Sequence, residues 1–483
     1  MSGTRDFVRF LAIWLAVMGA SAAAQSPTPG DGLAESATAQ PVPPGNGRNE
    51  SATVQPPAPV DVASPGPGGP SQARAAETVP TEIQREQAGT APPETNFLAR
   101  FLGIDDSPVK VYGWLQNSYT GNANGTPKND QNFSVFPNRL ANRWQGNQYY
   151  LVIEKPARQE DMIDFGFRVD TLFGNDWQYS KDYGLFNNAF TPNGFAGVDF
   201  PQIYAEVHLP VLTPLGLDLR GGRFYDPAGY ESVMAVKRPL LSAAYCFNFS
   251  PFTFLGFQST WHVNPQLNVL NSAVNGNDRW FDTRYRFSYQ GGFNWTSKTG
   301  NTTWLALVLV GPAQLPTFPP TNSPFLPLGV PQSPPALVGK LNPLYANHPR
   351  TYVDTIVTHK WNDRLTQAME SFCIIDTDVV ETSGQVLREA SWYGFANWFL
   401  YTFDTDQKYT GVWRSEVFKD SNGTATGDAD TFYEMTLGLV YKPKPWLWFR
   451  PEARYDWAQF TKPFSDGTRG SQLTLAIDVI IQF

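Results

Sequence analysis

Apolar and polar residues alternate along most of the chain beyond Val109, and the final segment, Ser471–Phe483, shows the pattern most clearly. Its apolar side holds Leu473, Leu475, Ile477, Val479, Ile481 and Phe483, and its polar side holds Gln472, Thr474, Asp478 and Gln482. A period of two is that of a β-strand with one apolar face. Such a strand is an aggregation hazard unless both of its edges are paired, so we expect it to close a barrel against the first strand.

The same alternation predicts about 16 antiparallel strands, an even number as in bacterial outer-membrane barrels. Their expected spans are Val109–Tyr119, Asn147–Lys155, Asp161–Phe173, Asp199–Leu209, Leu215–Phe224, Phe252–Val263, Gln266–Val274, Arg284–Thr296, Thr302–Val310, Thr351–Lys360, Arg364–Ile375, Ala390–Phe403, Gln407–Phe418, Thr431–Tyr441, Trp446–Gln459 and Ser471–Phe483. The predicted fold class is therefore all-β, an antiparallel transmembrane β-barrel.

The connections between these spans are alternately short and long. The short ones include "PARQE", "PVLTP", "NP", "SKTGN", "WND" and "KPKP". The long ones include Gly121–Gly146, Gly174–Val198, Tyr225–Pro251 and Gly311–Arg350. This rhythm is typical of periplasmic turns and extracellular loops, and it places both ends of the barrel in the periplasm.

Composition agrees with this architecture and narrows the function. Charged residues make up 17% of the chain and aromatic residues 14%, with 15 Trp. Few charges and many aromatic residues suit strands that alternate between lipid and lumen. The net charge of -8 argues against nucleic acid as a partner. The two cysteines, Cys246 and Cys373, give no disulfide framework, although one bridge between them stays open.

The region before the barrel divides into three parts. Residues 1–24 carry Arg5 and Arg9, an apolar core and an alanine-rich exit, which predicts a signal peptide and export. Residues 25–93 are rich in Pro, Ala and Ser, with a repeated "ESAT", and are expected to form a disordered periplasmic linker. Residues 94–108 predict a short amphipathic helix docked at the periplasmic rim, and residues 109–483 the outer-membrane barrel.

Charged residues share one face of several strands, opposite an apolar face. Because Arg facing lipid at the bilayer midplane costs about 2–4 kcal/mol, we expect the charged faces to line the lumen. A barrel of this size is too wide to be filled by its own side chains and leaves an aqueous channel. The predicted pore-lining residues are Asp164, Arg168, Asp170, Asp218, Arg220, Arg284, Arg286, Arg450, Glu452, Arg454 and Asp456.

The connection Tyr225–Pro251 is unusually apolar for a solvated loop, since it contains "VMAVKRPLLSAAYCF". We hypothesise that it folds into the lumen opposite Arg168, Arg220, Arg284 and Arg286, where charged side chains set solute preference. Its own charged residues are Asp226, Glu231, Lys237 and Arg238. The alternative is an outward flap that closes the top of the barrel.

With the strands placed, four stretches carry a family resemblance: "VKVYGWLQNSYTGN", "GRFYDPAGYESV", "WRSEVFKDSNG" and "RPEARYDW". Over Val109–Phe483 the chain resembles the putative beta-barrel porin 2 family of OmpL-like outer-membrane proteins. The resemblance implies a porin-like barrel in the outer membrane, and in general porins the constriction loop also follows the fifth strand. It assigns no role to the residues of the "GRF…GYE" motif, which begins at Gly222 and ends at Glu231.

The sequence holds no recognisable catalytic or metal-binding motif. Its four histidines, His208, His262, His348 and His359, stand in no metal-ligand spacing, and we expect no metal and no cofactor. The expected function is that of a porin, not an enzyme: small hydrophilic solutes or ions would diffuse through a charge-lined aqueous lumen, and outer-membrane lipid would surround the barrel. Its terminal Phe483 is expected to address the chain to the barrel assembly machinery, and porin analogy suggests a homotrimer. One rival is a loop-plugged structural or adhesive barrel that presents Gly311–Arg350, and another is a barrel hydrolase that uses His262.

Overall fold

The computed structural model describes residues 98, 101, 103 and 107–483, apart from 129, 134–136, 159–160, 183–195, 281–286, 313–348 and 381–385. The predicted signal peptide and linker, residues 1–93, lie outside the described residues. Within the predicted helix 94–108, Leu98 and Phe101 are helical and Phe101 is exposed.

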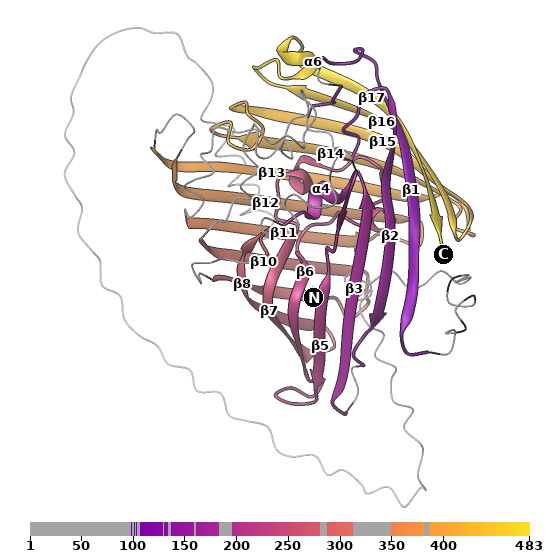
Figure 1. The fold of residues 1–483 in the computed structure, drawn as a ribbon, viewed down its shortest axis with the longest axis vertical. Coiled ribbons are helices and arrows are strands. Elements are labelled where there is room, and N and C mark those ends of the chain that lie inside the picture. The colour runs from indigo at the N-terminus through magenta and orange to yellow at the C-terminus, as the bar shows by residue number, and fades with distance from the viewer. Residues whose placement is uncertain are drawn as a thin grey trace, which may run out of the picture. The chain divides into compact units, whose positions relative to one another are not determined.

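Antiparallel strands follow one another around a single closed sheet (Figure 1). They are β1 (Lys110–Asn122), β2 (Arg143–Lys155), β3 (Asp164–Gly174), β4 (Gly197–Asp199), β5 (Ile203–Leu209), β6 (Leu217–Tyr225), β7 (Thr253–Asn264), β8 (Leu267–Asn277), β9 (Ser288–Thr296), β10 (Thr302–Pro312), β11 (Pro349–Lys360), β12 (Leu365–Val380), β13 (Val386–Thr402), β14 (Tyr409–Asp420), β15 (Asp430–Lys444), β16 (Leu447–Ala458) and β17 (Ser471–Gln482). Because β4 and β5 both pair with β3, they occupy one strand position in the wall. The barrel is therefore 16-stranded, as predicted.

In the described parts of the connections there are four single-turn helices. They are α4 (Trp177–Ser180), η1 (Ala235–Lys237), α5 (Tyr245–Asn248) and α6 (Phe464–Gly467). Among the described residues, no helix is long and apolar enough to cross a membrane.

The barrel closes where β1 pairs with β17, from Trp114 opposite Gln482 to Asn122 opposite Thr474. Two backbone hydrogen bonds extend this ladder to the last residue, since Gly113 N donates to Phe483 O (2.9 Å) and Phe483 N donates to Gly113 O (3.0 Å). A Cβ atom on Gly113 would overlap the backbone oxygen of Tyr150 on β2 and would lie 2.9 Å from the Phe483 ring. Only glycine therefore allows the two chain segments to come this close.

The predicted strand Asp199–Leu209 is interrupted, because residues 200–202 separate β4 from β5. Pro201 lies in this gap and has no N–H to donate to a ladder, so a strand cannot run through it unbroken. The neighbouring Gln202 still contributes its carbonyl, which accepts a hydrogen bond from Asp170 N (2.8 Å).

Apolar side chains cover the outer wall. Phe165, Leu437 and Leu475 are 66%, 64% and 54% exposed. Their neighbours in the same strands face inward and are buried or half-buried. This alternation is that of an outer-membrane barrel with an apolar belt. It also agrees with the inward direction predicted for Arg168 and Asp170 and for the charged residues between Arg450 and Asp456.

The connections alternate in length as expected, with one exception: five residues lie between β12 and β13, fewer than the eight between β2 and β3. The short ones link β2 to β3, β5 to β6, β7 to β8, β9 to β10, β11 to β12, β13 to β14 and β15 to β16, and we call this rim the short-turn end. The opposite rim, the long-loop end, carries the longer connections.

Candidate pore and inserted segment

The connection between β6 and β7, residues 226–252, folds into the interior of the barrel, and we call it the inserted segment. Every one of its residues is described, and each is buried or half-buried. Its side chains belong to the same apolar clusters as inward-facing residues of the wall. The hypothesis that Tyr225–Pro251 folds into the lumen therefore matches its position, and the outward flap does not.

The irregular backbone of the inserted segment forms hydrogen bonds with polar side chains of the wall. Gln148 of β2 accepts from Ala235 N (3.0 Å) and donates to Val233 O (2.6 Å). Glu452 of β16 accepts from Leu241 N (2.9 Å) and Ser242 N (3.0 Å). Buried backbone groups need such partners, and here the segment has no neighbouring strand to supply them.

The same kind of contact recurs on other strands. On β14, Glu416 accepts hydrogen bonds from Tyr245 N and Cys246 N, each 2.6 Å long. On β11 and β12, Asp354 and Glu370 accept from Gly229 N (2.9 Å) and Tyr230 N (2.8 Å). The wall thus supplies acidic side chains where the segment presents N–H groups.

Arginines of the wall donate to the carbonyl groups of the segment. Arg450 Nη1 donates to Ala235 O (3.0 Å), and Arg414 Nη1 donates to Ser242 O (2.7 Å). Arg454 Nη1 donates to Ala243 O (2.5 Å). Charges of both signs line the inner wall because the segment offers both donors and acceptors to them.

Apolar packing also holds the segment against the wall, partly on the same strands. Phe249 lies 4.9 Å from Phe418 between ring centroids, and Tyr230 lies 4.7 Å from Trp398. Trp392 also donates its indole N–H to Phe249 O (3.0 Å). The wall residues in this cluster include Leu305, Leu307, Leu309, Ile356, Phe372, Ile374, Trp392, Trp398, Phe418 and Phe432.

The predicted pore-lining residues of β3 lie on the inner face. Arg168 is buried and bonds Glu154 Oε2 (2.9 Å) and Asp170 Oδ1 (2.7 Å), and its Nη2 lies 3.6 Å from the Met234 sulfur of the inserted segment. Asp164 lies at the short-turn end, 2.8 Å from Lys155 Nζ.

The predicted pore-lining residues of β16 also face inward, where the inserted segment covers them. Arg450, Glu452, Arg454 and Asp456 are between 0% and 6% exposed. Asp456 accepts the Tyr245 hydroxyl (2.8 Å), and Arg450 bonds Asp478 of β17 (2.5 Å). These four side chains therefore contact other protein groups inside the barrel.

On β6, by contrast, two predicted residues are accessible. Asp218 and Arg220 each have a side chain that is 26% exposed, and Arg220 bonds Glu206 Oε2 of β5 (3.2 Å). Arg284 and Arg286 lie outside the described residues. The accessible charges described on the inner face, Asp164 among them, therefore gather near the short-turn end of β3, β5 and β6.

The four charged residues predicted for the constriction belong to the inserted segment. Glu231 is buried and bonds Arg414 Nη1 (2.8 Å), and Arg238 lies 3.6 Å from Asp176 Oδ2 of the β3–β4 connection. Lys237 ends η1. Asp226 lies where the segment leaves β6 and accepts a hydrogen bond from Gln290 of β9 (3.0 Å).

Both cysteines are free. Cys246 is buried inside the barrel, whereas Cys373 lies between the inward-facing Phe372 and Ile374 and so is on the outer side of β12. The wall of the barrel separates the two thiols, which rules out the bridge left open by the sequence.

Sequence reasoning missed the residues that hold the segment from β2, β11, β12 and β14. Among them are Gln148, Asp354, Glu370, Arg414 and Glu416. In "WRSEVFKD" the same parity rule would have placed Arg414 and Glu416 inside, opposite Trp413 and Val417. Nothing in the local pattern indicates the distant backbone groups that they bind.

Asp226 gives the inserted segment a pH-dependent contact. Its Oδ1 accepts hydrogen bonds from Ala228 N and Gln290 Nε2, each 3.0 Å long, and its Oδ2 is buried with no hydrogen-bond partner among the described residues. Burial, assisted by the nearby Asp354 and opposed by the bond from Ala228, raises the pKa of the Asp226 carboxyl to about 8.

We expect the barrel to lose thermal stability as the pH rises from about 6 to 8. The pKa of Asp is about 3.9 in an unfolded chain, so in this window the folded protein holds a proton that the unfolded chain lacks, and stability falls by up to about 1.4 kcal/mol per pH unit. Asp226→Asn, which is neutral throughout, should reduce this slope by up to about 1.4 kcal/mol per pH unit, the share that the Asp226 carboxyl contributes. The unfolding temperature, followed by heat-modifiable gel mobility across this range, measures it. Parallel slopes for the variant and the wild type would show that another group titrates.

These features define a class of protein: a porin-like outer-membrane β-barrel with a segment folded inside the lumen. The family model described as putative beta-barrel porin-2, OmpL-like, matches residues 108–483, and the chain belongs to this family. No curated protein sequence matches the chain.

Three solved structures, one of them a porin and one an outer membrane channel, resemble the barrel. The anion-selective porin from Comamonas acidovorans is 8% identical, with a TM-score of 0.50, over 78% of this chain and 99% of that chain. The outer membrane channel DcaP of Acinetobacter baumannii is 8% identical, with a TM-score of 0.49, over 78% of this chain and 97% of that chain. OprB of Pseudomonas putida is 12% identical, with a TM-score of 0.47, over 80% of this chain and 97% of that chain. At 8% identity, the likeness to the Comamonas porin concerns the fold alone.

Proposed function

We propose that the protein is an outer-membrane porin that passes small hydrophilic solutes or ions by diffusion along a narrow, charge-lined route beside the inserted segment. The observation that carries this proposal is the group of accessible charges on the inner face near the short-turn end, Glu206, Asp218 and Arg220. Apolar or neutral side chains would suffice if this surface only had to pack. Charges that remain in contact with water suit a passage for polar solutes.

The proposal includes the organisation predicted from the sequence. Residues 1–24 direct export, residues 25–93 form a periplasmic spacer, residues 94–108 dock at the rim, and Phe483 addresses the chain to the barrel assembly machinery. A homotrimer is part of it by analogy with other porins. The protein acts without enzymatic chemistry or a cofactor in this function.

A second function, that of a plugged structural or adhesive barrel, is favoured by one observation. The inserted segment is buried along its whole length, and the wall residues of β16 that it covers are almost inaccessible. The two functions differ in whether a continuous aqueous route passes the segment.

Single-channel recording in a planar bilayer distinguishes them. We expect the refolded protein to give steady conductance, and we expect Arg220→Gln, which removes an accessible positive charge, to move the reversal potential under a salt gradient toward cation preference. Lys408→Ala is the control, because Lys408 is a solvent-exposed charge on a short turn, paired with Asp406. A silent bilayer containing folded barrels would favour the plugged barrel. Equal reversal potentials for Arg220→Gln and the wild type would place the route elsewhere.

A further inference from the structure

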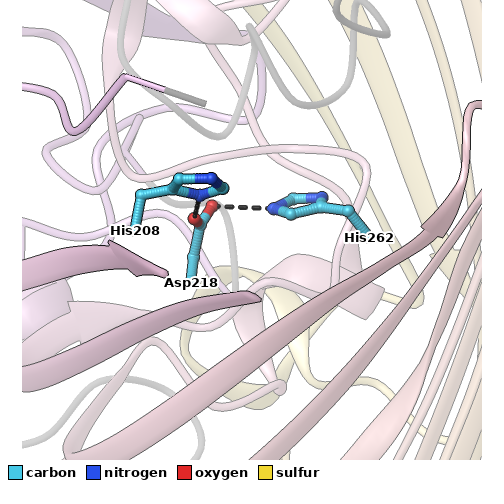
Figure 2. Close-up of side chains that lie close together, drawn as sticks. All are labelled: His208, Asp218 and His262. Atoms are coloured by element: carbon cyan, nitrogen blue, oxygen red, sulfur yellow. Dashed lines mark hydrogen bonds and ion pairs between the residues drawn. The ribbon is translucent and has the colours of Figure 1, made fainter. Parts of the chain in front are cut away.

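Three side chains converge on the inner face near the short-turn end: His208 of β5, Asp218 of β6 and His262 of β7. His208 and Asp218 are direct partners across the β5–β6 ladder. His208 Nδ1 lies 2.6 Å from Asp218 Oδ1, and His262 Nε2 lies 2.8 Å from Asp218 Oδ2. Figure 2 shows both rings turned toward this one carboxylate. Three neighbouring strands thus bring together residues that no sequence spacing connects.

The surroundings fix the orientation of both rings. His262 Nδ1 lies 2.9 Å from Asn268 Oδ1 on β8. Behind His208, a Cβ atom on Gly216 would lie 2.6 Å from the ring carbon Cε1, and Gly216 has a φ of +80° that favours glycine. Such outer contacts orient histidine ligands in known metal sites and select the ring nitrogen that carries the lone pair.

The contacts of His262 leave a place for a cation. Both of its ring nitrogens face oxygen acceptors, but a neutral imidazole has one N–H to give. With that proton directed at Asn268, the Nε2 lone pair points at the Asp218 carboxylate. Two electron-rich atoms at this separation repel each other unless a proton or a metal ion lies between them.

The chemistry of the donor set indicates which ion. One ligand atom from each of His208, Asp218 and His262 can be chosen so that all lie within 4.8 Å of one another. Two imidazole nitrogens with one carboxylate oxygen suit Zn²⁺ and related divalent ions, whereas Ca²⁺ and Mg²⁺ prefer oxygen ligands alone. Three protein ligands would leave a fourth position open to water or a solute. The Asp218 side chain is 26% exposed, which gives an ion a path from solvent.

We propose that His208, Asp218 and His262 bind a divalent first-row transition metal ion, of which Zn²⁺ is the best fit. Binding uses His208 Nδ1, a carboxylate oxygen of Asp218 and His262 Nε2, and it displaces the protons that these nitrogens otherwise carry. The ion brings two positive charges near Arg220 and Glu206, less one for each proton that leaves to solvent. Binding of the ion does not depend on whether the barrel conducts, so the proposal is independent of the porin function.

The test is calorimetric titration of the refolded full-length protein, stripped of metal by a chelator, with ZnCl₂ alone. We expect saturable binding with one ion per chain, and affinity weakened by about tenfold or more in His262→Gln and in Asp218→Asn. His359→Gln is the matched control, because His359 lies on β11 and contacts Thr302 Oγ1 (2.8 Å), away from these residues. It should bind as the wild type does.

Heat-modifiable mobility confirms that each variant is folded, and His208→Gln replaces any variant that is not. No saturable binding by the wild type would overturn the proposal. Wild-type affinity in both His262→Gln and Asp218→Asn would also overturn it, because the ion would then bind elsewhere. Loss of binding in His359→Gln alone would do the same.

Discussion

Replacing residues 229–249 of the inserted segment by a short glycine–serine linker is expected to raise single-channel conductance about fivefold or more, because a barrel of this size leaves an aqueous channel once nothing fills it. The barrel should still form. Its strands are paired along both edges by the β ladders alone, and the closing pair, β1 with β17, does not involve the segment. The charged residues of β16 would then face water, which suits them.

The control for this excision shortens a different connection, residues 298–300 between β9 and β10, which are exposed on a short turn. That variant should conduct as the wild type does. Unchanged conductance in a correctly folded excision variant would show that the inserted segment does not limit the passage. Heat-modifiable mobility separates this result from a failure to fold.

The second large effect is expected at Arg414. Its guanidinium bonds Glu231 of the inserted segment (2.8 Å) and Glu434 of β15 (2.7 Å), and all three side chains are inaccessible. Arg414→Met leaves two buried carboxylates without this partner, and breaking a buried ion pair in this way typically costs about 3–5 kcal/mol. We expect a marked fall in unfolding temperature and unstable, noisy conductance as the segment loosens.

Two comparisons make this prediction specific. Arg143→Ala breaks an ion pair of similar length, 2.7 Å to Asp130, but with side chains that are 51% and 42% exposed. Exposed pairs contribute about 1 kcal/mol or less, so its effect should be small. The double variant Arg414→Met/Glu231→Gln should recover part of the loss, because it removes one of the two stranded charges. If Arg414→Met were no more destabilising than Arg143→Ala, the buried network would not hold the segment.

The wall of the barrel was predictable because each strand carries its own signal. In Leu447–Trp457 and in Ser471–Phe483, alternation alone gives the correct faces, since lipid requires apolar side chains on the outside of every strand. Breaks within a strand were harder to predict from the sequence. The break between β4 and β5 depends on Pro201, which lies inside an otherwise regular strand pattern.

The contents of the lumen were only partly predictable. In "ASWYGFANWFLYTF" both faces are aromatic, so polarity cannot orient the strand. The structure places Trp392 and Trp398 inside and Tyr393 and Tyr401 outside. Trp392 and Trp398 face the lumen because there they pack against the inserted segment. The expectation of a polar lumen does not hold where protein fills the lumen. The ion pairs likewise join residues far apart in sequence, such as Glu231 and Arg414, which no local pattern connects.

The position of the inserted segment in the chain also constrains the order in which the molecule folds. The segment follows β6, but the side chains that bind its backbone come largely from β11 to β16, and Leu241 and Glu452 are 211 residues apart. Contacts of such long range form slowly, since a large loop must close before they are made. Until the second half of the sheet has formed, the apolar side chains of the segment cannot pack against the wall. Its backbone groups also lack the hydrogen-bond partners that β11 to β16 supply. A nascent barrel is therefore most vulnerable to aggregation after β6 and β7 have formed and before β14 and β16 arrive, and the rate of closure decides how long that period lasts.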